Sequence, residues 1–156
     1  MYNSKKILLF ISGERGQVLY NHLHKKGFNI AAVIFDKKKP GYKTLIAECK
    51  KLKINTILSS NVNKDNNILS LDPDLIIVAG FSTIFKEPLL SCSKLGIINL
   101  HAGNLPKYRG GSPLHWQIIN GEKKVWCSII KMDNGIDTGR LLVKSSLNIG
   151  HNERIK

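Results

Sequence analysis

The sequence has few cysteines and no long hydrophobic run. Its three cysteines are widely spaced and form no CxxC pair, which argues against a disulfide framework or a zinc site and favours a reducing, cytoplasmic location. No segment approaches the roughly 20 apolar residues of a transmembrane helix, so no membrane partner is expected. Near the N-terminus, the run ILLFI is five residues long and leads into SGERG without a cleavage pattern. It therefore indicates a buried strand rather than a signal peptide.

Acidic residues are also scarce, with 11 Asp and Glu against 24 Lys and Arg and a formal net charge of +13. Such an excess attracts polyanions, so nucleic acid is one candidate partner. Most of the excess is lysine in short groups, and no stripe of alternating basic and aromatic residues is present. A basic surface that serves a small anionic substrate explains the charge equally well, so charge alone leaves both possibilities open.

The 156 residues, of which 42% are hydrophobic and 22% charged, suit a single globular domain over residues 1–156. Apolar runs alternate with helical patterns over the first hundred residues, which predicts an α/β domain with a mainly parallel sheet. The expected strands are 7–11, 30–35, 55–58, 75–78, 96–101, 125–132 and 141–146. The expected helices are 17–26, with Gly27 as its C-cap, then 44–52, 68–71, 84–90 and 114–120.

Polar residues close the apolar strand GIINLH. Asn99 and His101 lie two positions apart, so their side chains leave the same face of the strand. In a parallel sheet, ligands bind at the carboxyl ends of strands. Either residue alone could simply satisfy buried backbone groups. Here a Gly- and Pro-rich loop follows them, and a second polar turn, 133–139, holds two carboxylates. Together these features predict a polar catalytic pocket.

An imidazole, an amide and a carboxylate around one point suit acyl transfer to an amine. Asn99 and a protonated His101 can donate to the developing oxyanion. A carboxylate can take the proton from the attacking amine and favours the imidazolium form of a nearby histidine. No serine or cysteine nucleophile is needed, because the substrate amine attacks. The residues alone do not identify the acyl donor.

Two stretches of sequence resemble the signatures of folate-dependent formyltransferases. The first is INLHAGNLPKYRG at 98–110, followed by SPLHW and NGE, and the second is IIKMDNGIDTGRLL at 129–142. SGERG and PDLIIVAGFSTI match in order and spacing, so the resemblance spans nearly the whole chain. It implies a Rossmann-like, open, mainly parallel sheet with helices on both faces. It also implies formyl transfer from 10-formyltetrahydrofolate to a primary amine, without a metal.

The resemblance also implies roles for individual residues. Asn99 and His101 would stabilise the tetrahedral intermediate, and Asp137 would orient His101 and relay the amine proton. The implied folate contacts are Phe81, Ser82, Thr83, Ile84, Asp133 and Gly135. The implied contacts with the amine substrate are Ser12, Gly13, Arg15, Lys107, Tyr108 and Arg109. Simpler interpretations stay open: Phe81 and Ile84 as core residues, SGERG as a tight strand-to-helix turn, and 107–111 as an ordinary loop.

The acceptor is the least determined part. Glycinamide ribonucleotide formyltransferases typically lack the YRGGSPLHW extension, whereas methionyl-tRNA formyltransferases add a basic loop and a second domain. The LPKYRG, SPLHW and NGE segments most resemble sugar-nucleotide N-formyltransferases, which favours a phosphate-bearing nucleotide sugar as partner over tRNA. Family catalytic domains continue beyond the point where HNERIK ends, so the domain is expected to be incomplete. A non-catalytic folate- or nucleotide-binding remnant and a nucleic-acid-binding module are the alternatives; the oligomeric state is not predicted.

Overall fold

A computed structural model describes residues 4–38 and 42–150. Its strands are β1 (Ile7–Ile11), β2 (Ile30–Asp36), β3 (Asn55–Ser59), β4 (Leu75–Ala79), β5 (Ile97–His101), β6 (Lys124–Lys131) and β7 (Arg140–Asn148). Its helices are α1 (Gly13–Lys25), α2 (Lys43–Lys51), α3 (Asn66–Leu69) and α4 (Pro113–Ile119), with the 3₁₀ turns η2 (Val62–Lys64) and η3 (Leu89–Ser91). Within the described ranges the strands form one sheet in the order β3-β2-β1-β4-β5-β6-β7. The predicted α/β class is confirmed.

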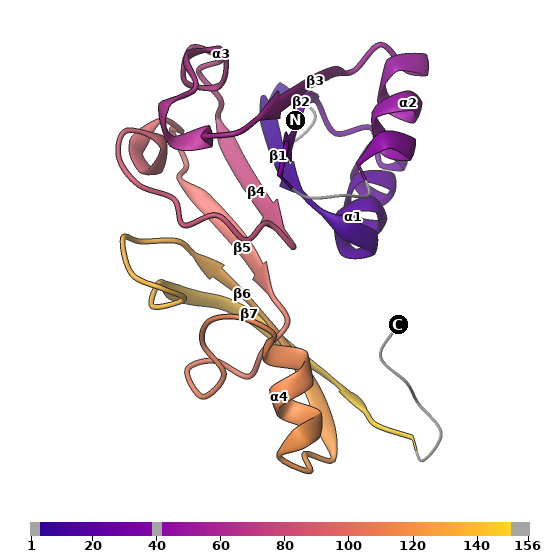
Figure 1. Ribbon diagram of the computed structural model, residues 1–156, viewed down its shortest axis with the longest axis vertical. Helices are drawn as coiled ribbons and strands as arrows, with labels where there is room; N and C mark the ends of the chain where they lie inside the picture. Colours follow the sequence, from indigo (N-terminus) through magenta and orange to yellow (C-terminus); the bar gives the residue numbers. More distant parts are fainter. Residues whose placement is uncertain (1–3, 39–41, 151–156) are drawn as a thin grey trace. The chain divides into compact units, whose positions relative to one another are not determined.

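The chain divides into two compact units, Met1–Ile98 and Asn99–Lys156. In the first unit, β1 pairs in parallel with β2 and with β4, and β2 pairs in parallel with β3. Every residue of β1 is buried. Since consecutive strand residues point to opposite faces, this burial means that both faces of the sheet are covered. Figure 1 shows α1 and α2 on one side of β1–β3 and α3 on the other.

Helix α1 begins a full turn earlier than its apolar pattern predicts. Ser12 is extended, with φ of −151°, and the helix starts directly after it. Most of SGERG is therefore the first turn of α1 rather than a loop. The predicted end at Gly27 is confirmed: its φ is 73°, a conformation that glycine adopts without strain. The N–H of Phe28 then donates to the carbonyl of Leu23 at 3.1 Å, which closes the helix in a Schellman motif.

The prediction of a helix over 84–90 is wrong: between β4 and β5 the structure has only the short 3₁₀ turn η3. Pro88 has no N–H and disfavours helical conformation at the residue before it. The side chain of Asn63 bonds the backbone of this segment instead. Its Nδ2 donates to the carbonyl of Ile84 at 3.0 Å, and its Oδ1 accepts from the N–H of Lys86 at 2.8 Å. An amide side chain distant in the sequence thus replaces helical hydrogen bonds.

The second unit contains the antiparallel pair β6–β7, with a register shift between Ile129 and Ile130. On β6, Ser128 and Ile130 are buried, whereas the residues of the edge strand β7 are exposed or half-buried. Helix α4 begins at Pro113, one residue before its predicted start, and proline suits this first position because its missing N–H would have no partner in the helix. Its Gln117 is fully buried. The interior of this unit therefore includes polar side chains, which can form hydrogen bonds to the backbone of its loops.

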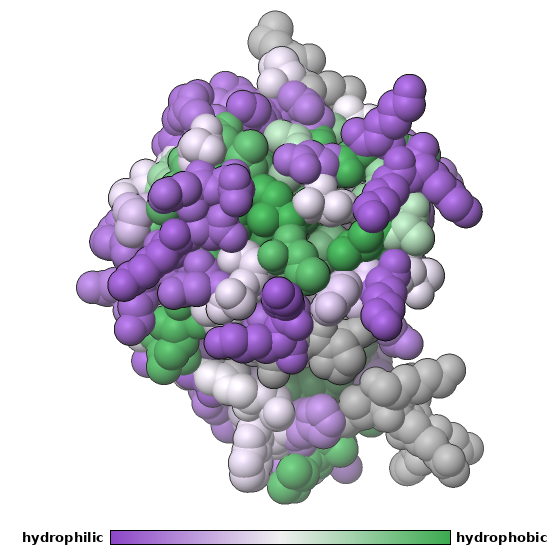
Figure 2. Space-filling view, turned by 45° about the horizontal axis from the view of Figure 1, so that its top comes forward, coloured by the Kyte–Doolittle hydropathy of each residue, from purple (hydrophilic) through white to green (hydrophobic). Residues whose placement is uncertain are grey.

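Hydrophilic side chains cover much of the face drawn in Figure 2, and hydrophobic residues form smaller exposed patches between them. Exposed apolar residues of the chain include Val18, Trp116, Ile119 and Leu147. Scattered apolar residues are normal on a folded protein. None of the helices within residues 4–38 and 42–150 is long and apolar enough to cross a bilayer.

Candidate active site

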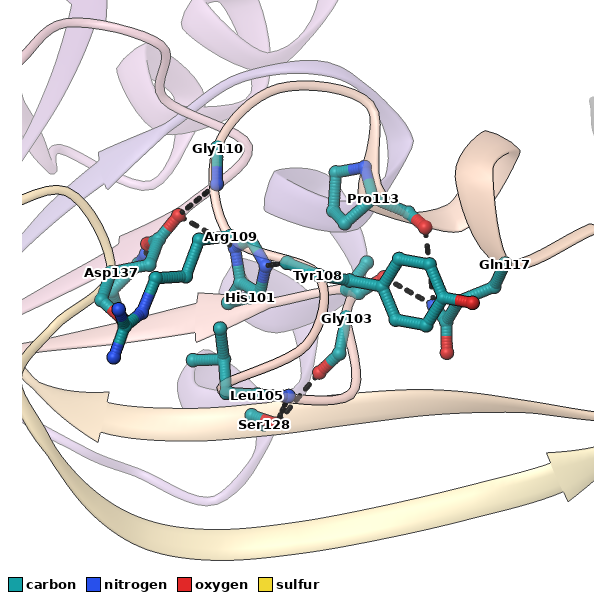
Figure 3. Close-up of polar contacts among 12 residues, drawn as sticks. His101, Gly103, Leu105, Tyr108, Arg109, Gly110, Pro113, Gln117, Ser128 and Asp137 are labelled. Atoms are coloured by element: carbon teal, nitrogen blue, oxygen red, sulfur yellow. Dashed lines mark hydrogen bonds and ion pairs between the residues drawn. The ribbon is translucent and has the colours of Figure 1, made fainter. Parts of the chain in front are cut away.

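Asn99 and His101 lie on β5 and meet the carboxylate of Asp137, which follows β6 in the same unit. The Nδ2 of Asn99 donates to Asp137 Oδ1 at 3.3 Å, and the Nδ1 of His101 lies 3.3 Å from Asp137 Oδ2. The side chains of His101 and Asp137 are only 6% and 14% exposed. The structure therefore brings together the three side chains that the sequence places in one pocket. Figure 3 shows His101 between Asp137 and the loop that carries Tyr108.

The backbone around Asp137 fixes the direction of its carboxylate. Asp137 has a φ of 50°, in the left-handed region that few residues other than glycine adopt. The N–H of Gly110 donates to Asp137 Oδ2 at 2.9 Å. Arg109 supports the turn as well, because its Nε donates to the carbonyl of Asp137 at 3.2 Å. With donors at both oxygens, the carboxylate has one defined orientation toward His101.

The other ring nitrogen of His101, Nε2, is in hydrogen-bond contact with the carbonyl of Tyr108. A carbonyl can only accept, so Nε2 must carry the hydrogen. Nδ1 faces the carboxylate of Asp137, which also accepts when ionised. Each ring nitrogen therefore has a protein partner, Nε2 the carbonyl of Tyr108 and Nδ1 the carboxylate of Asp137.

The loop after β5 lies in close contact with the ring of His101. A Cβ added at Gly103 would lie 2.6 Å from His101 Nε2 and 2.7 Å from the carbonyl of Tyr108. Both separations are too short for real atoms, so only glycine fits there. Two fully buried polar residues, Gln117 and Ser128, bond this loop. Neither residue was predicted from the sequence; the one available signal was a serine within the apolar run of β6.

The side chains of Lys107 and Tyr108, predicted to border the amine substrate, both bond Glu122. Lys107 Nζ lies 2.6 Å and the Tyr108 hydroxyl 2.7 Å from Glu122 Oε1. The hydrogen bond from Lys107, and then that from Tyr108, lowers the pKa of Glu122. The same bond to Glu122 raises the pKa of Lys107. Glu122 was not selected from the sequence, and the substrate roles of Lys107, Tyr108 and the exposed Arg109 stay predictions.

The residues predicted to contact folate lie in both units. In the first unit, Phe81 is half-buried and packs edge-on against Phe10, with ring centroids 5.5 Å apart. Ile84 is 55% exposed, so it is not a core residue. Ser82 is exposed, and the hydroxyl of Thr83 lies 3.5 Å from a carboxylate oxygen of Asp36. This segment therefore offers apolar and hydroxyl groups close to the surface.

In the second unit, the side chain of Asp133 accepts hydrogen bonds from within the turn that begins at this residue. Its Oδ1 accepts from the Thr138 hydroxyl at 2.6 Å and from the N–H of Gly135 at 3.0 Å. These two hydrogen bonds lower the pKa of Asp133, and the bond from the Thr138 hydroxyl has the larger effect. The carboxylate that contacts His101 is that of Asp137, as predicted, while Asp133 shapes the turn that holds it.

Ser12, Gly13 and Arg15, the remaining predicted substrate contacts, lie at the start of α1 in the first unit. Ser12 is half-buried, and its side chain makes no capping hydrogen bond to the helix. Gly13 and Arg15 are exposed. Within the described residues, no three His, Cys, Asp or Glu side chains cluster as metal ligands.

Known proteins similar to this chain include methionyl-tRNA formyltransferases. The chain is 36% identical to a methionyl-tRNA formyltransferase from Caldanaerobacter subterraneus over 138 residues, 81% of this chain and 45% of that protein. Another, from Clostridioides difficile, is 45% identical over 87 residues, 56% of this chain and 28% of that protein. The chain thus spans less than half the length of these curated relatives.

Solved structures show the same fold. A sugar N-formyltransferase from a Shewanella species has a TM-score of 0.70 at 23% identity, over 94% of this chain and 58% of that one. The likeness to it at this identity concerns the fold. The model of the formyl transferase family matches residues 5–156. The chain belongs to the formyl transferase family.

Proposed function

We propose that the protein transfers a formyl group from 10-formyltetrahydrofolate to a primary amine, with Asn99, His101 and Asp137 as its reaction centre. The observation that carries this proposal is the contact of an amide, an imidazole and a carboxylate within one unit. Asn99 Nδ2 and His101 Nδ1 each lie 3.3 Å from a carboxylate oxygen of Asp137. The family match over residues 5–156 supports the same chemistry.

Each of the three groups has a part in the proposed reaction. The amine nitrogen attacks the formyl carbon, and the carbonyl oxygen takes the negative charge. Asn99 Nδ2 gives one hydrogen to Asp137, so its second hydrogen is available for this oxygen. His101 can donate from Nδ1, which faces Asp137 at 3.3 Å, by sharing its hydrogen between that carboxylate and the substrate oxygen. Both donors would stabilise the tetrahedral intermediate.

Asp137 accounts for the proton. The attacking amine becomes positively charged when the new C–N bond forms, and it must lose a proton before the intermediate collapses. Asp137 accepts this proton, directly or through a water molecule. The bond between the formyl carbon and the folate nitrogen then breaks, and the proton passes to that nitrogen. Formylated amine and tetrahydrofolate are the products, and no metal takes part.

For the donor, the proposed folate contacts are those that the family resemblance implies. Phe81 and Ile84 offer apolar surface in the first unit, with Ser82 and Thr83 between them. Asp133 and Gly135 form the turn before Asp137. Since the Asp133 side chain is engaged within its turn, its contribution to folate binding would come from the backbone.

For the acceptor, we propose the amino group of a nucleotide-linked amino sugar. The combined run of LPKYRG, SPLHW and NGE supports this class, whereas the net charge of +13 suits either a nucleotide sugar or tRNA. Methionyl-tRNA is the second candidate, favoured by the identity of 36% to 45% to proteins of that name. The acceptor phosphates would meet basic groups such as Arg15 and Arg109, both exposed.

The decisive experiment is release of tetrahydrofolate from 10-formyltetrahydrofolate in the presence of single acceptors. The panel comprises nucleotide-linked amino sugars, methionyl-tRNA and glycinamide ribonucleotide. Turnover with an amino sugar is expected; turnover with methionyl-tRNA alone would move the assignment to the second candidate. Folate binding without turnover on any acceptor would contradict the proposed reaction and indicate a binding remnant.

Nucleic-acid binding is tested separately. A surface that serves a small anion should bind random duplex DNA weakly and release it at moderate salt. Non-specific phosphate contacts lose much of their affinity by about 0.2 M salt. Tight binding that survives this concentration would favour a nucleic-acid-binding function over the proposed one.

A further inference from the structure

Two polar side chains of the second unit are completely buried and belong to no predicted site. Gln117 on α4 and Ser128 on β6 are both 0% exposed. Buried polar groups destabilise a fold unless they are hydrogen-bonded. Their partners are backbone atoms, and several of these belong to the loop after β5.

Ser128 bonds the loop twice. Its hydroxyl donates to the carbonyl of Gly103 at 2.7 Å and accepts from the N–H of Leu105 at 3.3 Å. A third contact comes from β7, where Lys144 Nζ donates to the carbonyl of Leu105 at 2.9 Å. A side chain of β6 therefore provides hydrogen bonds to a loop that has no strand partner at these positions.

Gln117 joins three segments. Its Oε1 accepts from the N–H of Trp126 on β6 at 2.8 Å, and its Nε2 donates to the carbonyl of Ala102 at 3.0 Å. The carbonyls of Pro113 and Trp126 lie 3.3 and 3.4 Å from the same nitrogen. The amide thus links the start of the loop to both α4 and β6. Figure 3 shows Gln117 and Ser128 reaching this loop from α4 and β6.

The anchored loop carries the atoms that surround the His101 ring. Gly103 lies so close that an added Cβ would be 2.6 Å from Nε2. The carbonyl of Tyr108, further along the same loop, accepts from that nitrogen. If Ala102–Leu105 shifted, Gly103 would either press on the ring or leave space for it to rotate. The position of the loop therefore determines which way Nδ1 points.

We propose that Gln117 and Ser128 are positioning residues. By holding Ala102–Leu105 they fix the imidazole of His101 with Nε2 on the backbone and Nδ1 toward Asp137. Neither side chain reaches the reaction centre itself, so each acts through the loop. The catalytic consequence rests on the proposed formyl transfer, whereas the effect on the ring does not.

The test compares Ser128→Ala and Gln117→Met with Ser128→Thr, in the full chain labelled with ¹⁵N-histidine. Ser128→Ala and Gln117→Met remove the bonds at nearly constant volume, and Ser128→Thr keeps the hydroxyl. Ile130→Val is the matched control, because Ile130 is a buried residue of the same strand with a 1% exposed side chain. The His101 signals are identified by their loss in a His101→Asn sample.

In the parent protein, His101 should give one sharp set of ring signals with hydrogen on Nε2. In Ser128→Ala and Gln117→Met these signals should broaden or split, while Ser128→Thr and Ile130→Val keep the parent pattern. Formyl transfer should fall in the two loop variants about tenfold to a hundredfold in kcat, since small displacements of reacting groups carry costs of that order. The KM for the amine should stay within about twofold.

Thermal unfolding of each variant separates positioning from ordinary stabilisation. Parent-like His101 signals in folded Ser128→Ala and Gln117→Met would overturn the proposal, and so would equal broadening in Ile130→Val at equal loss of stability. Ring signals that broaden as much in Ser128→Thr as in Ser128→Ala would also contradict it. If the parent catalyses no formyl transfer, the proposed function fails, but the ring signals still decide the positioning role.

Discussion

The two units of the chain are held together in different ways. In the first, all five residues of β1 are apolar and buried, and the buried polar residues among those that the structure describes are the serines Ser59 and Ser93. In the second, the interior includes His101, Gln117 and Ser128, and their hydrogen bonds connect backbone segments distant in the sequence. Apolar burial is tolerant of small rearrangements, whereas a polar network works only when every partner is in place. The unit that supplies the candidate catalytic residues is thus the one with the more exacting interior.

The largest expected effect is on catalysis, from changes in the second unit. His101→Ala and Asp137→Asn should each reduce formyl transfer by about two or more orders of magnitude, the cost of losing one oxyanion donor or a general acid–base group. Asp137→Asn keeps the shape but removes the proton acceptor. The measurement is tetrahydrofolate release, with circular dichroism to verify folding.

Because the two residues act on one proton transfer, the double variant should be little slower than either single one. His115→Ala is the control, since His115 is an exposed histidine of α4 in the same unit. Near-parent rates in either active-site variant would show that the residue has a structural role only.

The next effect is on stability, in the first unit. Leu9 is 0% exposed on β1, which lies between β2 and β4. Leu9→Ala should lower the free energy of unfolding by about 2–5 kcal/mol, as for other buried leucines. The kcat per folded molecule should change little, which urea unfolding and active-site titration would show. A large loss of kcat at full folding would mean that the two units are not as different as proposed.

Gly103→Ala should combine both effects in the second unit. The new methyl group would meet His101 and Tyr108 at 2.6–2.8 Å, so the loop must move. Overpacking of this kind costs about 1–3 kcal/mol, and the His101 ring should move with the loop. Gly111→Ala is the stability control, because an added Cβ there meets nothing within 4 Å. Equal unfolding free energies of the two variants would refute the close contact.

The sequence predicts the strands better than the loops and the buried polar contacts, for a physical reason. Strands β1, β2 and β4 lie within one residue of their predicted limits. A strand that is buried on both faces has apolar residues at consecutive positions, and such a run is easily recognised in the sequence. The proximity of Asn99 and His101 was also predictable, since both are polar residues two positions apart where an apolar strand ends; their catalytic role stays a prediction. Gln117 and Ser128 were not predictable, because their partners are backbone atoms whose positions no sequence pattern reveals. The failed helix before β5 has the same cause: Asn63 binds that segment from elsewhere in the chain.

The smallest expected effect concerns Glu122 and its partner Lys107 on the surface of the second unit. Lys107 and Tyr108 lower the pKa of Glu122, so the resulting stabilisation is present above its unfolded pKa of about 4.3 and is lost as the pH falls through the lower folded value. Glu122 raises the pKa of Lys107, so that contribution is present below about pH 10.4 and is lost as the pH rises through the higher folded value. Glu122→Gln should therefore be slightly less stable than the parent at pH 7, and the difference should shrink as the pH falls below about 4.

Urea unfolding of the parent, Glu122→Gln, Lys107→Gln and the double variant measures this interaction as a cycle. The coupling should weaken in about 1 M salt, because exposed ion pairs are screened. Formyl transfer should change far less in Glu122→Gln than in His101→Ala, since Glu122 touches the loop only through the ends of two side chains. A pH-independent stability difference would mean that hydrogen bonding to Tyr108, not charge, holds this part of the loop. An activity loss as large as that of His101→Ala would place Glu122 within the polar network that positions the reaction centre. The network would then include surface residues as well as the buried Gln117 and Ser128.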